Sequence, residues 1–295
     1  MNKTLRRVVS IVLLIAALSF GVYYLIKHRS LLTQLAHTPV WVIIVVLLLY
    51  VVMLGVLLVV LDANLRLCST KIKNQENFLL NAYTLLINFF IPGQNGPVYR
   101  GYYLKRCYGL KVRNYIAITL LYYLIYGIIS LMLISLGSQP WWYTLPLGIL
   151  MIVAGIVLAR LYARRSKFHI AEFNFGLKNI AYLVLAVILQ AIIQIIIYAV
   201  ELHGSSRAHI ALHQVITYTG AADLALFVAL TPGAIGIREA FLVFTEHLHH
   251  ISSGHILVAN VIDRSVYLVF LLIILVVTLS LHARQKLSDK KSQTN

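Results

Sequence analysis

The sequence predicts an all-α, polytopic membrane protein with six spanning helices, two re-entrant broken helices and an inverted repeat. Three observations support this fold class. Hydrophobic residues make up 60% of the 295 residues and charged residues only 12%, which is typical of chains that reside in a bilayer. Long apolar runs recur along the chain, and each is close to the roughly 20 residues that a spanning helix needs. A short Pro-Gly motif occurs twice, each time directly after an apolar segment.

The spanning helices are predicted from six apolar runs. In order, these are Val8–Ile26, Val40–Leu61, Tyr115–Leu136, Trp141–Ala159, Ile180–Val200 and Ile256–Leu281. The first run follows a basic stretch, as in a signal peptide, but it is longer than the apolar core of such a peptide and lacks a clear small-x-small cleavage site. We therefore expect it to be retained as a membrane anchor.

Two further apolar segments, Phe78–Ile91 and Ile210–Thr231, are expected to be re-entrant. The first is short for a span, and the second contains Asp223. Each ends at the repeated motif, which reads Pro92-Gly93-x-x-Gly96-x-x-x-Arg100 in the first copy and Pro232-Gly233-x-x-Gly236-x-Arg238-Glu239 in the second. Unpaired backbone at membrane depth is tolerated only where it faces protein or a watery cavity. The motif therefore predicts two helices that break inside the membrane.

The basic residues favour this re-entrant arrangement over full spans. If both segments return to the side they entered, most of the 25 Lys and Arg residues fall on one side, which the positive-inside rule assigns to the cytoplasm. Three full spans separate the two segments, so they enter from opposite sides and form an inverted repeat, an architecture of secondary transporters. We expect cytoplasmic N- and C-termini in the cell inner membrane, with one transmembrane domain over 1–282 and a basic cytoplasmic tail over 283–295.

The net charge of +16 does not indicate nucleic acid as a partner. The Lys and Arg residues lie in short loops at helix ends, where they are expected to contact anionic phospholipid at the cytoplasmic face. Cys68 and Cys107 have neither the spacing of a metal site nor the number needed for a disulfide framework. His209 and His213 have an i, i+4 spacing, but no Cys or carboxylate set completes a site. We expect no bound metal and no cofactor.

An anionic head group is the ligand that the motifs predict. After each motif a helix is expected to resume, from about Gly96 and from about Ala234, and its first amides carry the positive end of the helix dipole. Arg100 and Arg238 follow within the first turns, and Arg binds phosphate or carboxylate at two points. The alternative for each arginine is a surface anchor that snorkels to the interface. Both interpretations stay open for Arg100, whereas Arg238 lies in an apolar stretch beside Glu239, which favours an intramembrane role.

The last predicted span carries the charged residues Asp263 and Arg264. Charges at that depth need partners, so we expect Asp263 or Glu239 to pair with Arg238 or Arg264 and Asp223 to join them. Such a network either holds a site open or relays protons, or it is a static link between helices. Two pairs of amides, Gln190 with Gln194 and Asn81 with Asn88, are expected to serve either interhelical hydrogen bonding or substrate contact.

The segment Thr231 to Ala240 resembles the Pro-Gly-x-x-Gly-hydrophobic-Arg-Glu-Ala signature of the lysylphosphatidylglycerol synthase transmembrane family, the flippase-like region of the multiple peptide resistance factor. The likeness extends over nearly the whole chain. The first motif resembles the family's first motif, and Asp263-Arg264 resembles its basic position in the final span. The chain departs from the family pattern at Pro97, where an acid is common, and at Tyr122 and Tyr123, where an acid-Arg pair is common.

The resemblance implies lipid translocation by a flippase-like domain. We expect a transporter that moves an anionic or aminoacylated phospholipid, or a polyprenyl-phosphate-linked lipid, between leaflets. No Gly-x-x-x-x-Gly-Lys-[Ser/Thr] motif is present, so movement is expected to be downhill or coupled to ions through Asp223, Glu239 or Asp263. The chain ends without the aminoacyl-transferase domain of the fused relatives, so lipid aminoacylation by this polypeptide is not expected.

Two alternatives remain open. The first is a membrane-embedded transferase acting on lipid-linked substrates, although such chemistry usually needs clustered carboxylates with a metal, or an activated nucleophile. The nine acidic residues are scattered along the chain, so we do not expect an enzyme. The second is a non-catalytic membrane partner of a synthase or glycosyltransferase, in which the motifs serve helix packing. A lipid-modifying enzyme is the partner that this alternative predicts.

Overall fold

A computed structural model describes residues 38–91, 95–138, 142, 145–146, 148–155, 157, 174–205, 210–227 and 237–292. The described residues are almost entirely α-helical and contain no β-strand, which confirms the all-α class. The motif residues Pro92, Gly93, Pro232, Gly233 and Gly236 lie outside this part of the chain. The two Pro-Gly corners therefore stay predictions from the sequence.

Four of the helices in the described part are long and apolar enough to cross a membrane. They are α3 (Val40–Leu67), α6 (Val112–Ser138), α8 (Leu177–Ser205) and α12 (Ser253–Ser292). They correspond to four of the six predicted spans, so the chain is a multi-pass membrane protein. The predicted span Val8–Ile26 lies outside the described residues, and Trp141–Ala159 is described only in part, with helix over residues 148–155. Ten residues of the predicted tail, 283–292, continue α12.

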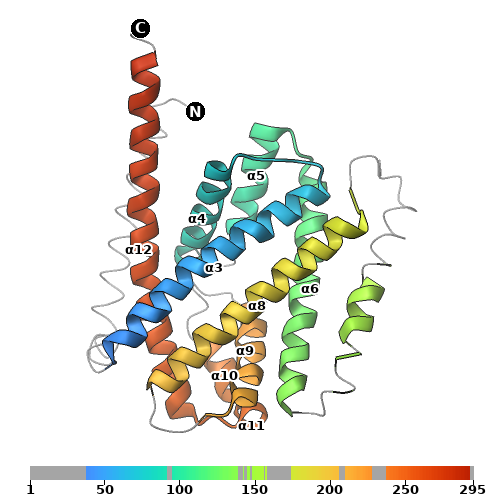
Figure 1. The fold of residues 1–295 in the computed structure, drawn as a ribbon, viewed down its shortest axis with the longest axis vertical. Helices are drawn as coiled ribbons and strands as arrows, with labels where there is room; N and C mark the ends of the chain where they lie inside the picture. The colour runs from blue at the N-terminus through green and yellow to red at the C-terminus, as the bar shows by residue number, and fades with distance from the viewer. Residues whose placement is uncertain are drawn as a thin grey trace.

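The first predicted re-entrant segment, Phe78–Ile91, falls on the first of a pair of helices that pack against each other. The pair consists of α4 (Asn74–Phe90) and α5 (Gly96–Tyr108). α5 begins at Gly96, where the sequence predicts that a helix resumes, and Pro97 occupies its first turn, where its missing N–H leaves no intrahelical hydrogen bond unmade. In Figure 1 the two helices lie beside the C-terminal end of α3.

The second predicted re-entrant segment, Ile210–Thr231, contains α9 (Leu212–Phe227). It is followed by α10 (Ile237–Phe244) and the short α11 (Glu246–His249). α9 packs against both α10 and α11. Figure 1 shows these three helices at the other end of the molecule from α4 and α5, near the C-terminal end of α8. The two helix groups that carry the repeated motif thus occupy opposite ends of the long helices.

Two glycines bring α6 and α9 into close contact. A Cβ atom on Gly220 would lie 2.4 Å from the carbonyl oxygen of Ser130, and one on Gly137 would lie 2.6 Å from the carbonyl oxygen of His213. Small residues at such positions let helix backbones approach each other, which is a common basis of helix association in membranes. α9 is therefore packed directly on the spanning helix α6.

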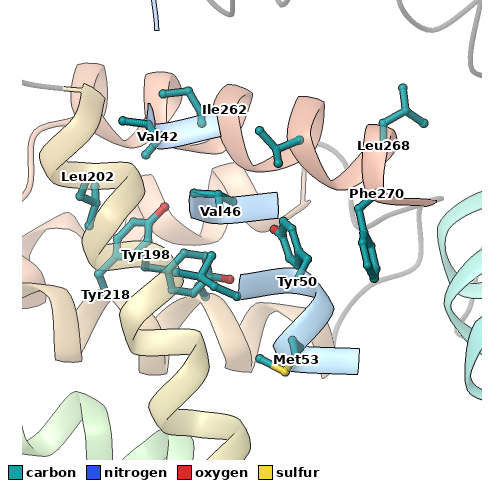
Figure 2. Close-up of a cluster of buried hydrophobic side chains, with 14 of the residues drawn as sticks. Val42, Val46, Tyr50, Met53, Tyr198, Leu202, Tyr218, Ile262, Leu268 and Phe270 are labelled. Atoms are coloured by element: carbon teal, nitrogen blue, oxygen red, sulfur yellow. The ribbon is translucent and has the colours of Figure 1, made fainter. Parts of the chain in front are cut away.

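A buried hydrophobic cluster joins α3, α8, α9 and α12. Figure 2 shows its side chains, with Val42, Val46, Tyr50 and Met53 from α3 facing Tyr198 and Leu202 from α8, Tyr218 from α9, and Ile262, Leu268 and Phe270 from α12. Tyr50, Tyr198 and Tyr218 are each less than 7% exposed. Their hydroxyl groups place polar atoms inside an apolar core, and buried polar atoms need partners.

Candidate functional site

Arg238 of α10 lies at the centre of a buried polar network. Its side chain is 6% exposed and forms an ion pair with Asp263 of α12 through Nη1. Nη2 donates a hydrogen bond of 2.8 Å to the hydroxyl of Tyr198, and the guanidinium carbon lies 5.1 Å from the centre of the Tyr198 ring. The second oxygen of Asp263 accepts a hydrogen bond from the hydroxyl of Tyr50. The network thus links α3, α8, α10 and α12.

A second ion pair runs parallel to the first. Arg264 Nε lies 2.9 Å from Glu239 Oε1, so consecutive residues of α10 pair with consecutive residues of α12. Of the alternatives that the sequence left open, the structure contains Arg238 with Asp263 and Glu239 with Arg264. Because the two pairs have both partners, the network places four charges in the membrane without leaving one of them uncompensated.

Asp223 is not a direct partner in either ion pair, although it lies close enough to Arg238 for an electrostatic interaction. Its carboxyl group is completely buried on α9 and lies beside the hydroxyl of Tyr126 from α6. Within the described residues, neither Arg238 nor Arg264 forms an ion pair with it. The Asp223 side chain lies beside Tyr126 of α6, whereas Arg238 of α10 pairs with Asp263 of α12 and Arg264 of α12 pairs with Glu239 of α10.

Glu201 is a member of the network that the sequence analysis missed. It lies on α8, is 1% exposed, and lies close enough to Asp263 and Arg238 to interact with both electrostatically. The predicted span ended at Val200, so Glu201 was expected at the membrane boundary. The available signal was an isolated acid directly after a long apolar run, a position at which an acidic side chain needs a partner if the helix continues.

The network borders a cavity of about 290 Å³ between the helices. The charged side chains that line it are Arg238, Asp263 and Arg264, and the remaining lining residues are aromatic, aliphatic or amide. Asn88 and Phe89, at the end of α4, line the same cavity. Both helix groups that carry the motif therefore contribute to one cavity.

The family model of the lysylphosphatidylglycerol synthase TM region matches residues 5–274. The chain belongs to the lysylphosphatidylglycerol synthase transmembrane family. The match includes both motifs, the cavity residues Tyr122 and Tyr123, and the α12 residues Asp263 and Arg264. No curated protein matches the chain.

Two of the three positions at which the sequence was expected to depart from the family pattern, Tyr122 and Tyr123, lie on the cavity wall, whereas the third, Pro97, lies on α5 outside the lining. Tyr122 and Tyr123 line the cavity from α6, and Tyr122 donates a hydrogen bond of 3.1 Å to Oε1 of Gln190. Phe227 of α9 completes this aromatic wall, with its ring centre 5.8 Å from that of Tyr123. Gln190 and Gln194 also line the cavity. The part of the cavity wall formed by Tyr122, Tyr123, Gln190 and Gln194 is thus polar but uncharged.

Arg100 lies outside this cavity lining. It is half-buried on α5, and its Nη2 donates a hydrogen bond of 3.0 Å to Oδ1 of Asn81. The amide of Gly96 donates a hydrogen bond of 2.8 Å to Oδ1 of Asn88. Both amide side chains of α4 therefore hold α5 in place, which is the interhelical role predicted as one of their two alternatives. Whether Arg100 also contacts substrate stays a prediction.

Gly96 is required by the close approach of α5 to α4. A Cβ atom at this position would lie 2.6 Å from Cγ2 of Thr84 and 2.7 Å from its carbonyl oxygen. Contacts of that length do not occur between real side chains, so a larger residue would push the two helices apart. This packing gives a structural reason for the last glycine of the first motif.

His249 is the buried histidine of the second helix group. Nε2–H donates to the carbonyl of Leu242 at 3.0 Å, and Nδ1 accepts from the amide of Ile251 at 3.2 Å. Burial lowers the pKa of His249 below its ordinary value. No cluster of three or more potential metal ligands occurs in the described part of the chain.

Proposed function

We propose that this member of the lysylphosphatidylglycerol synthase transmembrane family moves an anionic lipid between leaflets, with the lipid phosphate held at Arg238. The observation that supports the proposal is a buried arginine that has one N–H donor without a hydrogen-bond partner. Arg238 lines the cavity, and its Nε is buried without a hydrogen-bond partner among the described residues. Buried hydrogen-bond donors rarely lack an acceptor. A phosphate oxygen of a lipid bound in the cavity is a suitable acceptor for this one.

The rest of the cavity supports a phosphate head group. Arg264 provides a second guanidinium at the wall, and arginines bind phosphate through paired, charge-assisted hydrogen bonds. Tyr123, Gln190 and Gln194 also line the cavity and offer uncharged polar groups to the part of the head group beyond the phosphate. The acyl or prenyl chains remain in the hydrocarbon region of the bilayer, because only the charged head group is costly to place there.

The two helix groups suggest how the site opens. We take the pair α4–α5 and the group α9–α11 as the two halves of an inverted repeat, entering from opposite sides of an inner membrane with cytoplasmic termini. Each half places residues at the cavity, Asn88 from α4 and Arg238 from α10. Movement of one half against the other would expose the cavity first to one leaflet and then to the other, as in secondary transporters.

The test is lipid movement in reconstituted vesicles. Purified protein in vesicles containing acyl-labelled phosphatidylglycerol is expected to make inner-leaflet label accessible to a membrane-impermeant quencher faster than protein-free vesicles do. Arg238→Lys keeps the charge but loses the two-point contact, so it is expected to slow movement by about tenfold or more. Arg66→Lys is the matched control, because Arg66 forms an exposed ion pair with Asp62 outside the cavity lining.

The labelled substrates define the outcomes. Movement of phosphatidylglycerol or of a polyprenyl-phosphate lipid, but not of phosphatidylcholine, supports an anionic head group. The proposal is wrong if none of these lipids moves faster than in empty vesicles. If Arg238→Lys preserves cellular function while bulky substitutions of Gly96 abolish folding, the motifs serve packing and the protein is a membrane partner of another enzyme.

A further inference from the structure

We propose that the aromatic and amide part of the cavity binds an uncharged, hydroxylated ring of the lipid head group, linked to the phosphate held at Arg238. The proposal rests on the proposed function and narrows its substrate class to phosphate-linked lipids that carry a sugar or a similar polyhydroxylated ring. Two observations support it. Four aromatic side chains are grouped together in the cavity lining, and two glutamine side chains lie in the same lining.

The aromatic cluster consists of Tyr122, Tyr123 and Tyr126 of α6 and Phe227 of α9. The ring centre of Tyr122 lies 5.1 Å from that of Tyr123 and 6.0 Å from that of Tyr126. The ring centre of Phe227 lies 5.8 Å from that of Tyr123 and 6.0 Å from that of Tyr126. Each ring therefore has two aromatic neighbours, and all four rings line the cavity. Aromatic faces are negatively polarised, so the weakly positive C–H groups of a sugar ring pack well against them.

Two glutamines on α8 provide hydrogen-bonding groups beside this cluster. Tyr122 donates a hydrogen bond of 3.1 Å to Oε1 of Gln190, which joins the cluster to the amide and orients it. Among the described residues, Nε2 of Gln190 and the whole amide of Gln194 have no hydrogen-bond partner. An amide offers donors and an acceptor, and a sugar hydroxyl both donates and accepts. The two glutamines therefore suit the hydroxyl groups of a ring that lies on the cluster.

The same face of α8 connects the aromatic cluster to the phosphate site. Gln190, Gln194 and Tyr198 are spaced four residues apart, so they share one face of the helix, and all three line the cavity. Gln190 is bonded to Tyr122 at one end, and Tyr198 is bonded to Arg238 at the other. The three positions span about 12 Å of helix, which leaves room for a phosphate and one ring.

The size of the cavity also fits one ring rather than a longer sugar chain. Its volume of about 290 Å³ is close to the lower end of ligand pockets, which is roughly 300 Å³. The hydrophobic chain of the lipid does not need this space, because it stays in the bilayer. We therefore expect a head group with one phosphate and a single ring.

An aromatic cluster can also hold an ammonium group, but the charges of this cavity favour an uncharged ligand. The charged side chains in the lining are two arginines, Arg238 and Arg264, and one carboxylate, Asp263, which is paired with Arg238. Asp223 lies beside Tyr126 but is fully buried and is not a lining residue. An ammonium on the rings would thus meet no unpaired carboxylate in the described lining, whereas a hydroxylated ring needs none.

Binding of matched phosphodiester lipids tests the proposal. Short-chain phosphatidylglycerol and short-chain phosphatidylinositol have the same charge and the same phosphodiester, and they differ in carrying a glycerol or a hydroxylated ring. Calorimetry in detergent is expected to show that phosphatidylinositol binds wild-type protein about tenfold tighter or more. A hexose linked to a short polyprenyl phosphate is the second ring-bearing probe, and the tighter of the two identifies the lipid chain. Equal dissociation constants for phosphatidylglycerol and both ring-bearing lipids would overturn the proposal.

Variants assign the gain in affinity to the two kinds of side chain. Tyr123→Leu removes an aromatic face, and Gln194→Leu removes the amide with little change in size. Each is expected to weaken binding of the ring-bearing lipid about five- to tenfold and to change that of phosphatidylglycerol by no more than about twofold. Tyr102→Leu is the matched control for Tyr123→Leu, because Tyr102 is 60% exposed on α5 and lies outside the lining. Equal weakening of both lipids in Tyr123→Leu and Gln194→Leu would show that these residues only shape the cavity.

The outcomes separate the two proposals. If the protein binds and moves phosphatidylglycerol and the ring-bearing lipids equally well, the ring site is wrong and the proposed function stands. If phosphatidylethanolamine binds more tightly than phosphatidylinositol, the aromatic cluster holds an ammonium group and the ring site is again wrong. If no anionic lipid binds or moves, the proposed function fails. The wild-type comparison of lipids decides the question by itself if the variants do not fold.

Discussion

Arg238 and Asp263 form an ion pair that connects α10 to α12 across 25 residues of sequence. Both side chains are less than 9% exposed, so the pair is sheltered from water. Buried pairs contribute little net stability when both members are present, but removing one member leaves the other uncompensated. This asymmetry leads to the first prediction.

Asp263→Asn is expected to destabilise the protein by about 3–5 kcal/mol, because Arg238 loses its anionic partner inside the protein. The measurement is the free energy of unfolding in detergent, from denaturant or thermal transitions. Asp62→Asn breaks the exposed i, i+4 pair with Arg66 and is expected to cost no more than about 0.5 kcal/mol. Equal losses in the two variants would contradict the buried network.

Tyr50→Phe is expected to reduce stability by about 1.5–3 kcal/mol, because it deletes a hydroxyl that donates to the carboxylate of Asp263. Tyr267→Phe is the matched control. Its ring centre lies 5.1 Å from that of Tyr50, it lines the same cavity, and the same atom is removed. A loss of similar size in both variants would show that the hydroxyl of Tyr50 has no special partner.

Gly96→Ala is expected to destabilise the α4–α5 pair by about 1–3 kcal/mol through overpacking. The added Cβ would meet Thr84 at 2.6 Å. Gly55→Ala on α3 is the control, because a Cβ there meets nothing within 4 Å and alanine favours the helix. Thermal unfolding in detergent measures both, and a Gly96→Ala variant as stable as Gly55→Ala would refute the close packing.

Stability is expected to fall as the pH drops through the ordinary pKa of histidine, about 6.5. Burial lowers the pKa of His249 in the folded protein, so the unfolded chain binds the proton more readily and protonation favours unfolding. Above that pH the contribution is fully present. Melting temperatures at about pH 7.5 and about pH 5.5 test this, with a smaller difference expected in His249→Gln than in His247→Gln. The titratable neighbours Glu246, His247 and His250 also influence the pKa of His249 electrostatically.

Cys107 is expected to react with a maleimide, whereas Cys68 is expected to stay unmodified. Cys107 is exposed and Cys68 is buried, and burial raises the pKa of the Cys68 thiol to about 12, so the reactive thiolate is scarce. Mass spectrometry of the labelled protein, with Cys107→Ser as control, measures the modification. A membrane-impermeant maleimide is expected to label inside-out vesicles and not intact cells, because α5 is predicted to end at the cytoplasmic face.

The spanning helices could be predicted because their signal is local. A bilayer requires about 20 apolar residues in a row, and Val40 to Leu61 or Tyr115 to Leu136 supply them without reference to any other part of the chain. The start of α5 at Gly96 was predictable because the Pro-Gly motif before it is also a local signal. The six-span count and the inverted repeat depend on segments outside the described residues and stay predictions.

The partners of the charged residues could be predicted only as a set. Sequence spacing does not show how α10 faces α12, so Arg238 with Asp263 and Arg238 with Glu239 were equally acceptable. The same limit applies to Asp223 and Glu201. Asp223 was included because it is an acid in an apolar segment, but α9 directs it toward α6. Glu201 was left out because the apolar run ends one residue earlier, although α8 continues to Ser205.

The tight seam at Gly137 and Gly220 constrains any opening of the cavity. With backbone atoms of α6 and α9 in such direct contact, sliding one helix along the other would drive Ser130 and Ile134 into the α9 backbone. The two helices must therefore travel as one rigid body. If the protein moves lipid as proposed, the hinge lies elsewhere, and Phe89 and Phe227, which line the cavity from different helices, are expected to separate when the cavity opens.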